Sequence, residues 1–437
     1  MSTLGERIKE RRKIIGLTQS DLAGSNLSSG MVSLIERNLT NPSLKTIEQL
    51  SEKLGVSVNY LLNNEETDIN NIENKQISLN MLKGLIKAQK FEEAERILKE
   101  VNSQGEIDST LAGMYYKLKG ELELEKKEFN LAIDSFEQAL LYLNPYELNE
   151  YVDVYYHLAN CYVKIENFRK SIELSLQGIL LLNTSHTDTN VLLKLKLLYL
   201  QSYSYCRIRE FKKGLQVIEE AKEIMNETNC YYNEGMYCML SGLAYLYLKE
   251  FDKGIEQTER SIGLLNKDTQ YLQVIGCSTN LGILYRETKN YERSIKSLED
   301  SLLLSKTRKI DWSIWNNNLE LAITFYRNDD IEKSQKICEE SLVQIKDSNV
   351  LKIKMMLLLS KIKLDQDKNG EALLYVNEAK KEALIIDNST LMAKCYVIKA
   401  EILKKQQLYE EAFNEIRKSV QIYESSNENL YDSFPTE

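Results

Sequence analysis

Hydrophobic residues recur at the three- and four-residue spacing of amphipathic helices along almost the whole chain. In the first such segment, residues 3–14, Leu4 and Ile8 lie on one predicted face and Arg7 and Arg11 on the other. The pattern therefore predicts an all-α protein.

Capping residues divide residues 1–62, which we call the head, into five short helices. Thr18 precedes one helix and has Asp21 three residues later, which resembles a capping box. Ser28 and Ser43 are suitable N-caps for the helices that follow them. Gly55 is suited to end the fourth helix.

The chain changes character twice after the head. Residues 63–76 (NNEETDINNIENKQ) are polar and lack an apolar face, which predicts a linker, with a part-helical linker as the alternative. From residue 77 to residue 437, a small residue three positions after an aromatic or apolar one recurs at spacings of 38, 39, 43, 40, 40, 40, 38 and 40. The nine positions are Ala94, Ala132, Ser171, Gly214, Gly254, Ser294, Ser334, Ala372 and Ala412.

Two further mostly small positions accompany each of these, one seven residues later and one twelve residues earlier. Small side chains let neighbouring helices cross closely, so the coupled positions predict about nine pairs of helices. We call residues 77–437 the body. Only 3 prolines and 18 glycines are present, where average usage gives roughly 22 and 30, which argues against β-sandwiches and propellers.

Charge is distributed unevenly between these two parts. The whole chain carries a net charge of −9, but the head has 8 basic and 6 acidic residues. The body and linker therefore carry the excess of negative charge. This asymmetry favours a nucleic-acid contact confined to the head and excludes a chain wrapped in nucleic acid along its length.

The remaining composition argues against an enzyme, a metal site and a cofactor. The two histidines, His157 and His186, are far apart, and no nucleophile–base pairing or metal-ligand motif is present. Seven scattered cysteines without a C-x-x-C pair predict reduced and mostly buried thiols. There is neither a signal peptide nor an apolar run long enough to span a bilayer, so we expect a cytoplasmic protein.

The head resembles the XRE/Cro-C1 helix-turn-helix family through its segments L-T-Q at 17–19, L-A at 22–23, I-E-R at 35–37, N-P-S at 41–43 and L-G-V-S at 54–57. The resemblance implies that the helix after Ser28 enters the major groove. Base contacts are then expected from Ser29, Gly30, Met31 and Ser33. Phosphate contacts are expected from Gln19, Arg37, Asn38 and Lys45. Leu34 either faces the groove or belongs to the core, and each polar residue has the alternative of a solvated helix face.

The body resembles tetratricopeptide repeats, although its period of about 40 exceeds the usual 34. This implies an α-solenoid whose first helices line a concave groove. Head and body together resemble the RNPP group of quorum-sensing regulators, and in particular its NprR-like members. That group binds a short signalling peptide in the groove, which shifts conformation or oligomeric state.

The repeat frame indicates which residues face the groove. They are His157, Asn160, Lys164, Tyr199, Tyr203, Arg207, Asn280, Arg286, Glu320 and Arg327. Asn160 and Asn280 are suited to hold a peptide backbone, because an amide both donates and accepts hydrogen bonds. Arginines in this set can pair with a carboxylate. Each residue has the alternative of a structural polar contact, and for His157 a partly buried packing role is favoured.

These observations predict a peptide-responsive transcriptional regulator that binds operator DNA as a homodimer or higher homo-oligomer. The alternative is an interaction switch whose body sequesters a signalling partner such as a response regulator. Neither function requires a membrane or a cofactor.

Overall fold

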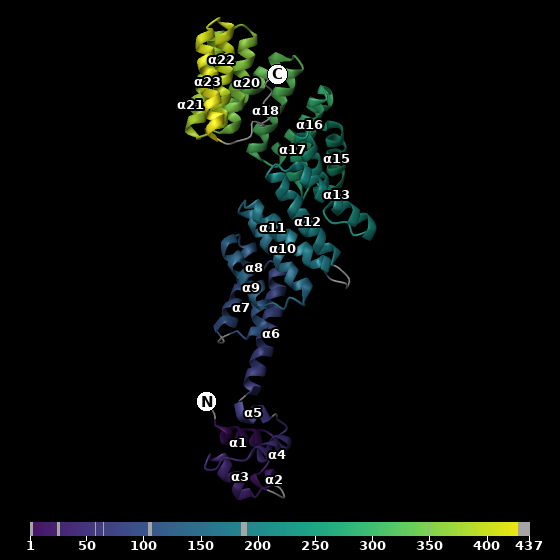
Figure 1. Ribbon diagram of the computed structural model, residues 1–437, viewed down its shortest axis with the longest axis vertical. Helices are drawn as coiled ribbons and strands as arrows, with labels where there is room; N and C mark the ends of the chain where they lie inside the picture. Colours follow the sequence, from purple (N-terminus) through teal and green to yellow (C-terminus); the bar gives the residue numbers. More distant parts are fainter. Residues whose placement is uncertain are drawn as a thin grey trace. The chain divides into compact units, whose positions relative to one another are not determined.

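The computed structural model describes residues 3–23, 27–56, 58–63, 65–103, 107–184, 190–347 and 349–426. Two features of the sequence, residues 24–26 of the motif turn and His186, lie outside the described residues. The described chain consists of helices joined by turns, which confirms the predicted all-α class (Figure 1). By its internal contacts the chain divides into two compact units, residues 1–193 and 194–437.

The head contains the five predicted helices, which are α1 (Leu4–Ile14), α2 (Gln19–Leu22), α3 (Ser29–Glu36), α4 (Leu44–Leu54) and α5 (Val58–Asn63). The caps lie where the sequence places them. Thr18 and Asp21 form a reciprocal capping box, and the Ser28 hydroxyl accepts a hydrogen bond from the backbone N–H of Met31. Gly55 ends α4 in the left-handed conformation, with φ at 63°.

The head core is built from one apolar face of each helix, and its members include Ile8, Leu22, Val32, Leu50 and Leu61. Two cationic side chains donate hydrogen bonds to carbonyls at the C-terminal ends of helices around this core. The Arg7 guanidinium donates to the carbonyls of Leu61 and Leu62, each over 2.9 Å. Lys53 donates to carbonyls at the end of α2. These bonds satisfy carbonyls that a helix C-terminus leaves without partners.

The described residues of the body form nine helix pairs, as the repeat spacing predicts. The pairs are α6 (Glu65–Lys87) with α7 (Phe91–Ser103), α8 (Ser109–Glu125) with α9 (Phe129–Tyr142), α10 (Leu148–Lys164) with α11 (Phe168–Thr184), α12 (Val191–Arg207) with α13 (Phe211–Thr228), α14 (Glu234–Tyr247) with α15 (Phe251–Leu264), α16 (Tyr271–Glu287) with α17 (Tyr291–Thr307), α18 (Asp311–Arg327) with α19 (Ile331–Gln344), α20 (Val350–Asp365) with α21 (Asn369–Ile385), and α22 (Ser389–Lys405) with α23 (Tyr409–Ser426).

The segment predicted as a linker at 63–76 is helical, because residues from Glu65 onward form the first part of α6. The segment contains neither proline nor glycine to interrupt a helix. Its last residues are also packed. Lys75 is 3% exposed, and the Gln76 amide lies 3.5 Å from the Met114 sulfur of α8. The boundaries predicted at 62 and 77 stay a prediction, since the two compact units divide elsewhere.

Small residues occupy the helix crossings, which is the reason we gave for the repeat. A Cβ atom on Gly282 would lie 2.5 Å from the buried Leu298 of the paired helix. Twelve residues after Gly282, the hydroxyl of buried Ser294 donates to the Gly282 carbonyl over 2.7 Å. Ser334 makes the same bond to Ala322. Close approach therefore also provides hydrogen bonds between paired helices.

The turns within pairs need neither proline nor glycine. Two residues after the end of each first helix, a residue has positive φ, and these residues recur with the repeat: Gln89, Lys127, Glu166, Arg209, Lys249, Lys289, Asp329, Asp367 and Gln407. After α16, the backbone N–H of Asn290 donates to the carbonyl of Tyr285, and that of Lys289 donates to Arg286. This is the Schellman pattern, which resolves the turn geometry without the usual prolines.

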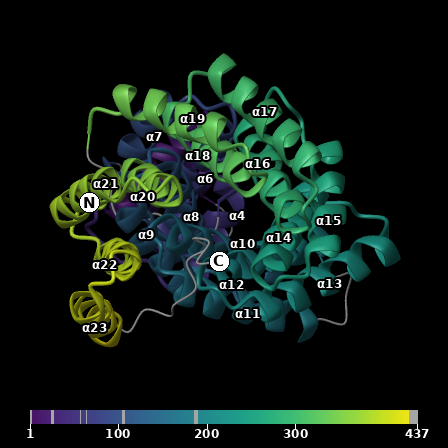
Figure 2. The same ribbon diagram turned by 90° about the horizontal axis from the view of Figure 1, so that it is seen from above.

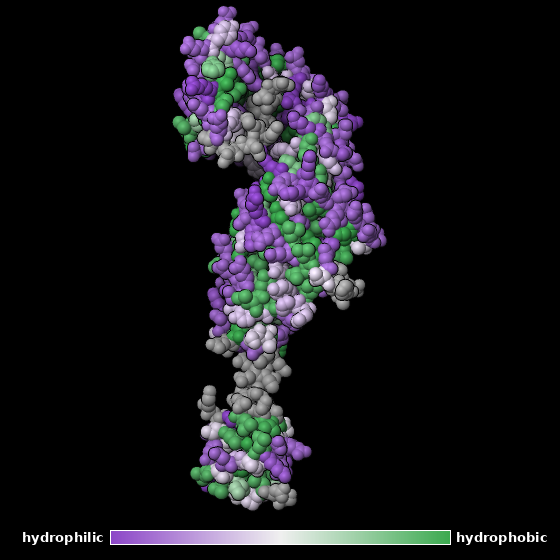
Figure 3. Space-filling model, in the orientation of Figure 1, coloured by the Kyte–Doolittle hydropathy of each residue, from purple (hydrophilic) through white to green (hydrophobic). Residues whose placement is uncertain are grey.

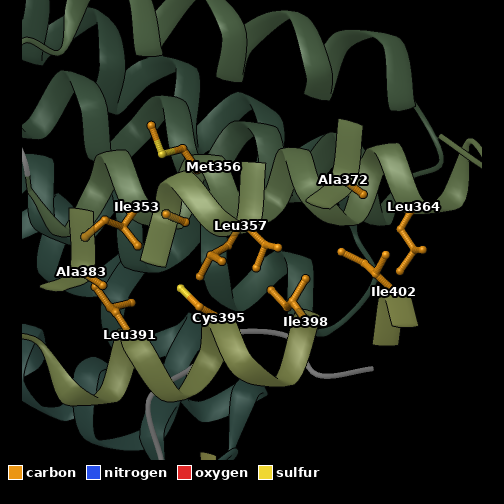
Figure 4. Close-up of a cluster of buried hydrophobic side chains, with 12 residues drawn as sticks. Ile353, Met356, Leu357, Leu364, Ala372, Ala383, Leu391, Cys395, Ile398 and Ile402 are labelled. Carbon is orange, nitrogen blue, oxygen red and sulfur yellow. The ribbon is translucent and has the colours of Figure 1, made fainter. Parts of the chain in front are cut away.

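Within the second unit, the helices of successive pairs form an arc (Figure 2). The first helices α14, α16, α18 and α20 lie on the inner side, and the second helices α15, α17, α19 and α21 lie on the outer side. Apolar side chains fill the space between pairs. Figure 4 shows one such cluster, in which Leu357 of α20, Ala372 of α21 and Cys395 of α22 are buried together. Among the described residues, no helix is long and apolar enough to cross a bilayer.

All seven cysteines are free thiols, and six of them are buried, as predicted. Burial raises the pKa of Cys161, Cys206, Cys338 and Cys395 to about 12, which suppresses the reactive thiolate. Cys230 is the half-buried exception. We expect one thiol per native chain to react rapidly with an aromatic disulfide reagent and Cys230→Ser to abolish that phase. Rapid reaction of two or more thiols in the native state would contradict the described packing.

Candidate functional site

Helix α3 presents one exposed face while its other face builds the head core. Val32 and Ile35 are buried, with 0% and 2% exposure. Ser29 and Gly30 are exposed, and Ser33, one turn further, is half-buried. The predicted base-contacting residues therefore lie together on the accessible side of the helix.

Two apolar residues extend this accessible side. Met31 is 44% exposed and Leu34 is 42% exposed, so Leu34 lies outside the core. Gly30 has open space around it, since the nearest atom to an added Cβ is the Ser28 hydroxyl at 3.9 Å. Packing within the head gives no reason for a glycine there. Close approach of a ligand backbone remains a reason for it.

The predicted phosphate-contacting residues divide into two kinds. Arg37 and Lys45 are exposed at the end of α3 and the start of α4. Gln19 donates its side-chain amide to Glu36 over 2.7 Å. Asn38 accepts from the backbone N–H of Gly5 at 3.0 Å and donates to Thr3 at 2.6 Å. The Asn38 amide thus ties α1 to the end of α3. Its assignment to a phosphate stays a prediction.

Sequence reasoning missed Glu36, the residue that organises this site. Its side chain is 2% exposed and pairs with Arg12 of α1, with an Nε–Oε1 distance of 2.6 Å. Burial raises the pKa of Glu36, but hydrogen bonds from Arg12 and Gln19 outweigh this and leave the pKa below its ordinary value. The available signal was a single acid at the end of an otherwise uncharged helix.

In the first unit, the predicted groove residues lie on α10. Asn160 is half-buried, and its amide makes no hydrogen bond within the described chain; Lys164 is exposed one turn later. His157 instead stacks on Phe136, with ring centroids 5.2 Å apart and an interplanar angle of 9°. The packing role favoured for His157 therefore matches its surroundings.

His157 also belongs to a charged cluster with Glu121 and Asp153, whose ligand atoms lie within 4.8 Å of one another. Burial raises the pKa of Asp153, but His157 and Lys117 reverse this and hold it well below its ordinary range. The Lys117 ammonium lies 2.6 Å from the Asp153 carboxylate. Because this ammonium already neutralises the carboxylate, the cluster is suited to a structural ion pair rather than to a metal.

In the second unit, Tyr199, Tyr203 and Arg207 follow one another along a single face of α12. Arg207 donates to the Tyr203 hydroxyl over 2.8 Å, and the two tyrosine rings lie 6.4 Å apart. Asn280 of α16 is half-buried, and its amide makes no hydrogen bond in the described residues. Asn280 thus retains the donor and acceptor that a peptide backbone would use.

Arg286 and Arg327, predicted to receive a ligand carboxylate, are engaged with acids of the chain itself. Arg286 is 5% exposed and donates to Glu320 over 2.7 Å. Arg327 donates to Glu287 over 2.8 Å. Both arginines line a cavity of about 840 Å³ whose wall also includes Lys249, Lys289, Tyr326 and Asp365. A ligand carboxylate there would have to compete with Glu320 and Glu287.

Two parts of the chain match known protein families. Residues 8–61 match the helix-turn-helix family, and residues 277–308 match the tetratricopeptide repeat family. The chain is 40% identical over 86 residues to the immunity repressor protein of Bacillus phage phi105, covering 18% of this chain and 60% of that protein. It is 45% identical over 65 residues to the HTH-type transcriptional regulator SinR of Bacillus licheniformis, covering 14% and 59%. The chain thus spans about 60% of the length of these relatives.

Among solved structures, the apo form of the quorum sensor NprR from B. thuringiensis aligns with a TM-score of 0.61 and 16% identity. The alignment covers 80% of this chain and 99% of that one. At this identity the likeness concerns the fold. Residues 8–61 are therefore a helix-turn-helix domain, and the chain over most of its length has the fold of NprR, in agreement with the predicted resemblance to RNPP-type regulators.

Proposed function

We propose that the chain is a cytoplasmic, peptide-responsive transcriptional regulator rather than an enzyme. The head binds operator DNA as a dimer, and the body binds a short peptide that shifts conformation or oligomeric state. The observation that carries the proposal is the accessible face of α3, where Ser29, Gly30 and Ser33 lie beside exposed Arg37. Helix-turn-helix proteins read the major groove with this part of the second motif helix.

The similar proteins support both halves of the proposal. The two relatives that match the head are named as a repressor and a transcriptional regulator. The similar solved structure is named as a quorum sensor. The half-buried amides of Asn160 and Asn280 support a ligand that needs backbone hydrogen bonds.

Removing both serine hydroxyls from α3 is expected to weaken specific DNA binding. Duplexes selected from a random library by the wild-type protein would supply the probe. Ser29→Ala with Ser33→Ala should weaken binding to them by about 10- to 100-fold, since the two single hydroxyls together contribute about as much as one bidentate base contact, roughly 1–3 kcal/mol. The control Ser103→Ala removes an exposed hydroxyl from the body and should leave affinity unchanged. Unchanged footprints for the double variant would reject the assigned base contacts.

The peptide half of the proposal is tested with synthetic peptides of 5–10 residues and the thermal unfolding of the full chain. A binding peptide raises the melting temperature by mass action. Asn280→Ala and Asn160→Ala, each made alone, should weaken that peptide by about 1–3 kcal/mol, or roughly 5- to 150-fold. The exposed Asn130→Ala of α9 is the matched control. A peptide that binds both variants as tightly as wild type would reject the assigned backbone contacts.

A further inference from the structure

The accessible face of α3 carries neither a charge nor a side-chain amide. Its exposed or half-buried residues are Ser29, Gly30, Met31, Ser33 and Leu34. Glu36 is the one charged residue of this helix, and its buried carboxylate is paired with Arg12 of α1. The part of the head that the proposed function places against the bases therefore offers only hydroxyl groups, a bare backbone and apolar side chains.

The two apolar side chains of this face are not used by the fold. Met31 and Leu34 are three residues apart, so they lie on the same side of the helix, and they are 44% and 42% exposed. The contribution of α3 to the head core comes instead from Val32 and Ile35. Figure 3 shows that hydrophobic side chains reach the surface of the head among hydrophilic ones. Met31 and Leu34 are therefore available to an apolar group of a ligand.

The helical period fixes the order of these residues around the accessible face. At 3.6 residues per turn, Ser29 and Ser33 lie on one side of the face, and Leu34 and Met31 lie on the other. Gly30 lies between the two groups, and the atom nearest to an added Cβ is 3.9 Å away. Because the centre of the face has no side chain, the backbone of α3 can approach a base edge until the flanking side chains touch it.

The chemistry of the major groove indicates which base such a face distinguishes. Guanine is read mainly by arginine or lysine, and adenine by the amide of asparagine or glutamine. The accessible face of α3 has none of these. Thymine is the standard base that presents a methyl group in the groove, and apolar side chains contact that methyl. The exposed cations Arg37 and Lys45 lie at the end of α3 and the start of α4, where they are suited to phosphates.

We propose that α3 recognises the C5-methyl groups of thymine through Leu34 and Met31, so that the operator is read at T·A pairs. This inference rests on the proposed regulatory function and deepens it, because it names the base pairs that the head distinguishes. Ser29 and Ser33 add hydrogen bonds, but a hydroxyl both donates and accepts and therefore selects no particular base. The methyl contacts supply the selectivity.

Deoxyuridine substitution tests the methyl contact with the wild-type chain. Each thymine of a duplex selected from the random library is replaced in turn by deoxyuridine, which pairs with adenine and lacks only the methyl. At one position or more, the full chain should bind about fourfold more weakly, the factor expected for one buried methyl-sized group. Equal affinity at every position, or a selected site without thymine, would overturn this inference alone. A library from which no duplex is enriched would contradict the DNA-binding function and this inference with it.

Alanine variants assign the methyl contact to its side chains. At a sensitive position, Leu34→Ala or Met31→Ala should bind the thymine and deoxyuridine duplexes equally, because the variant has lost the group that the methyl contacts. Each variant is compared with itself, so a smaller folded fraction lowers both affinities alike. Ile14→Ala is the matched control, since Ile14 is 71% exposed on α1 and should keep the fourfold difference. Retention of the full difference by both α3 variants would overturn the assignment to Leu34 and Met31.

Discussion

Replacing Glu36 with alanine is expected to unfold the helix-turn-helix head while the body stays folded. The substitution leaves the Arg12 guanidinium, whose side chain is 12% exposed, without its carboxylate partner. It also removes the acceptor of the Gln19 amide. Breaking a buried ion pair costs about 3–5 kcal/mol, whereas a domain of this size has roughly 3–9 kcal/mol of stability in total.

Hydrogen exchange of the full chain measures this effect locally. Peptides from residues 4–62 should exchange faster by a factor of about 100 or more in Glu36→Ala, and peptides from α16 to α21 should not change. The double variant Arg12→Met with Glu36→Leu is the control, because replacing both charges by apolar groups removes the unpaired charge and should recover part of the protection. Unchanged exchange in the head of Glu36→Ala would show that the ion pair contributes little.

The same pair makes the stability of the head depend on pH. The pKa of Glu36 is lower in the folded head than its ordinary value near 4.3 in an unfolded chain. The stability that ionised Glu36 gives the head is therefore complete above about pH 4.3. It is lost as the pH falls through the lower pKa that Glu36 has in the folded head. Head exchange measured at decreasing pH, after correction for the intrinsic rate, should show this loss in wild type and not in Arg12→Met with Glu36→Leu.

Two glycines of α16 are expected to respond in opposite directions to the same substitution. Gly282→Ala should destabilise the second unit by about 1–3 kcal/mol, because the new methyl would lie 2.5 Å from Leu298, a fully buried side chain. Gly276→Ala should stabilise it by up to about 1 kcal/mol, because nothing lies within 4 Å of the new methyl and alanine favours the helix.

Urea unfolding followed by tryptophan fluorescence is suited to this comparison. Both tryptophans of the chain, Trp312 and Trp315, lie on α18, which packs against α17. The transition midpoint should fall for Gly282→Ala and rise for Gly276→Ala. Adding Leu298→Ala to Gly282→Ala should relieve the clash. The double variant should therefore lose less stability than the sum of the losses of the two single variants. Equal midpoints for the two single variants would contradict the proposed helix crossing.

Much of the fold could be predicted because it depends on neighbours in the sequence. The caps at Thr18, Ser28 and Ser43 act on N–H groups three residues away. The paired helices follow from small residues that recur at regular intervals. The predicted linker is helical from Glu65 onward, and its polar composition indicated its chemistry and not its packing. Lys75 is polar and nonetheless 3% exposed.

The sequence predicted which helix face carries each candidate site. It did not predict which residues the side chains on that face contact. The accessible face of α3 and the half-buried Asn160 and Asn280 follow from helical periodicity. That Asn38 binds the start of α1 does not, and neither does the pairing of Arg286 with Glu320. A periodic pattern indicates the direction in which a side chain points. It does not indicate whether an acid on another helix neutralises that side chain.

The sequence by itself determined the helical class, the nine pairs, the helix-turn-helix head and the side of α3 that is accessible, because periodicity and capping act within a few residues of the chain. Only the tertiary structure decided which polar groups are engaged with one another and which stay available. The Arg12–Glu36 pair joins residues 24 positions apart, and the Arg286–Glu320 pair joins residues 34 apart. Such contacts form when separate helices pack, and their strength depends on the burial that this packing creates.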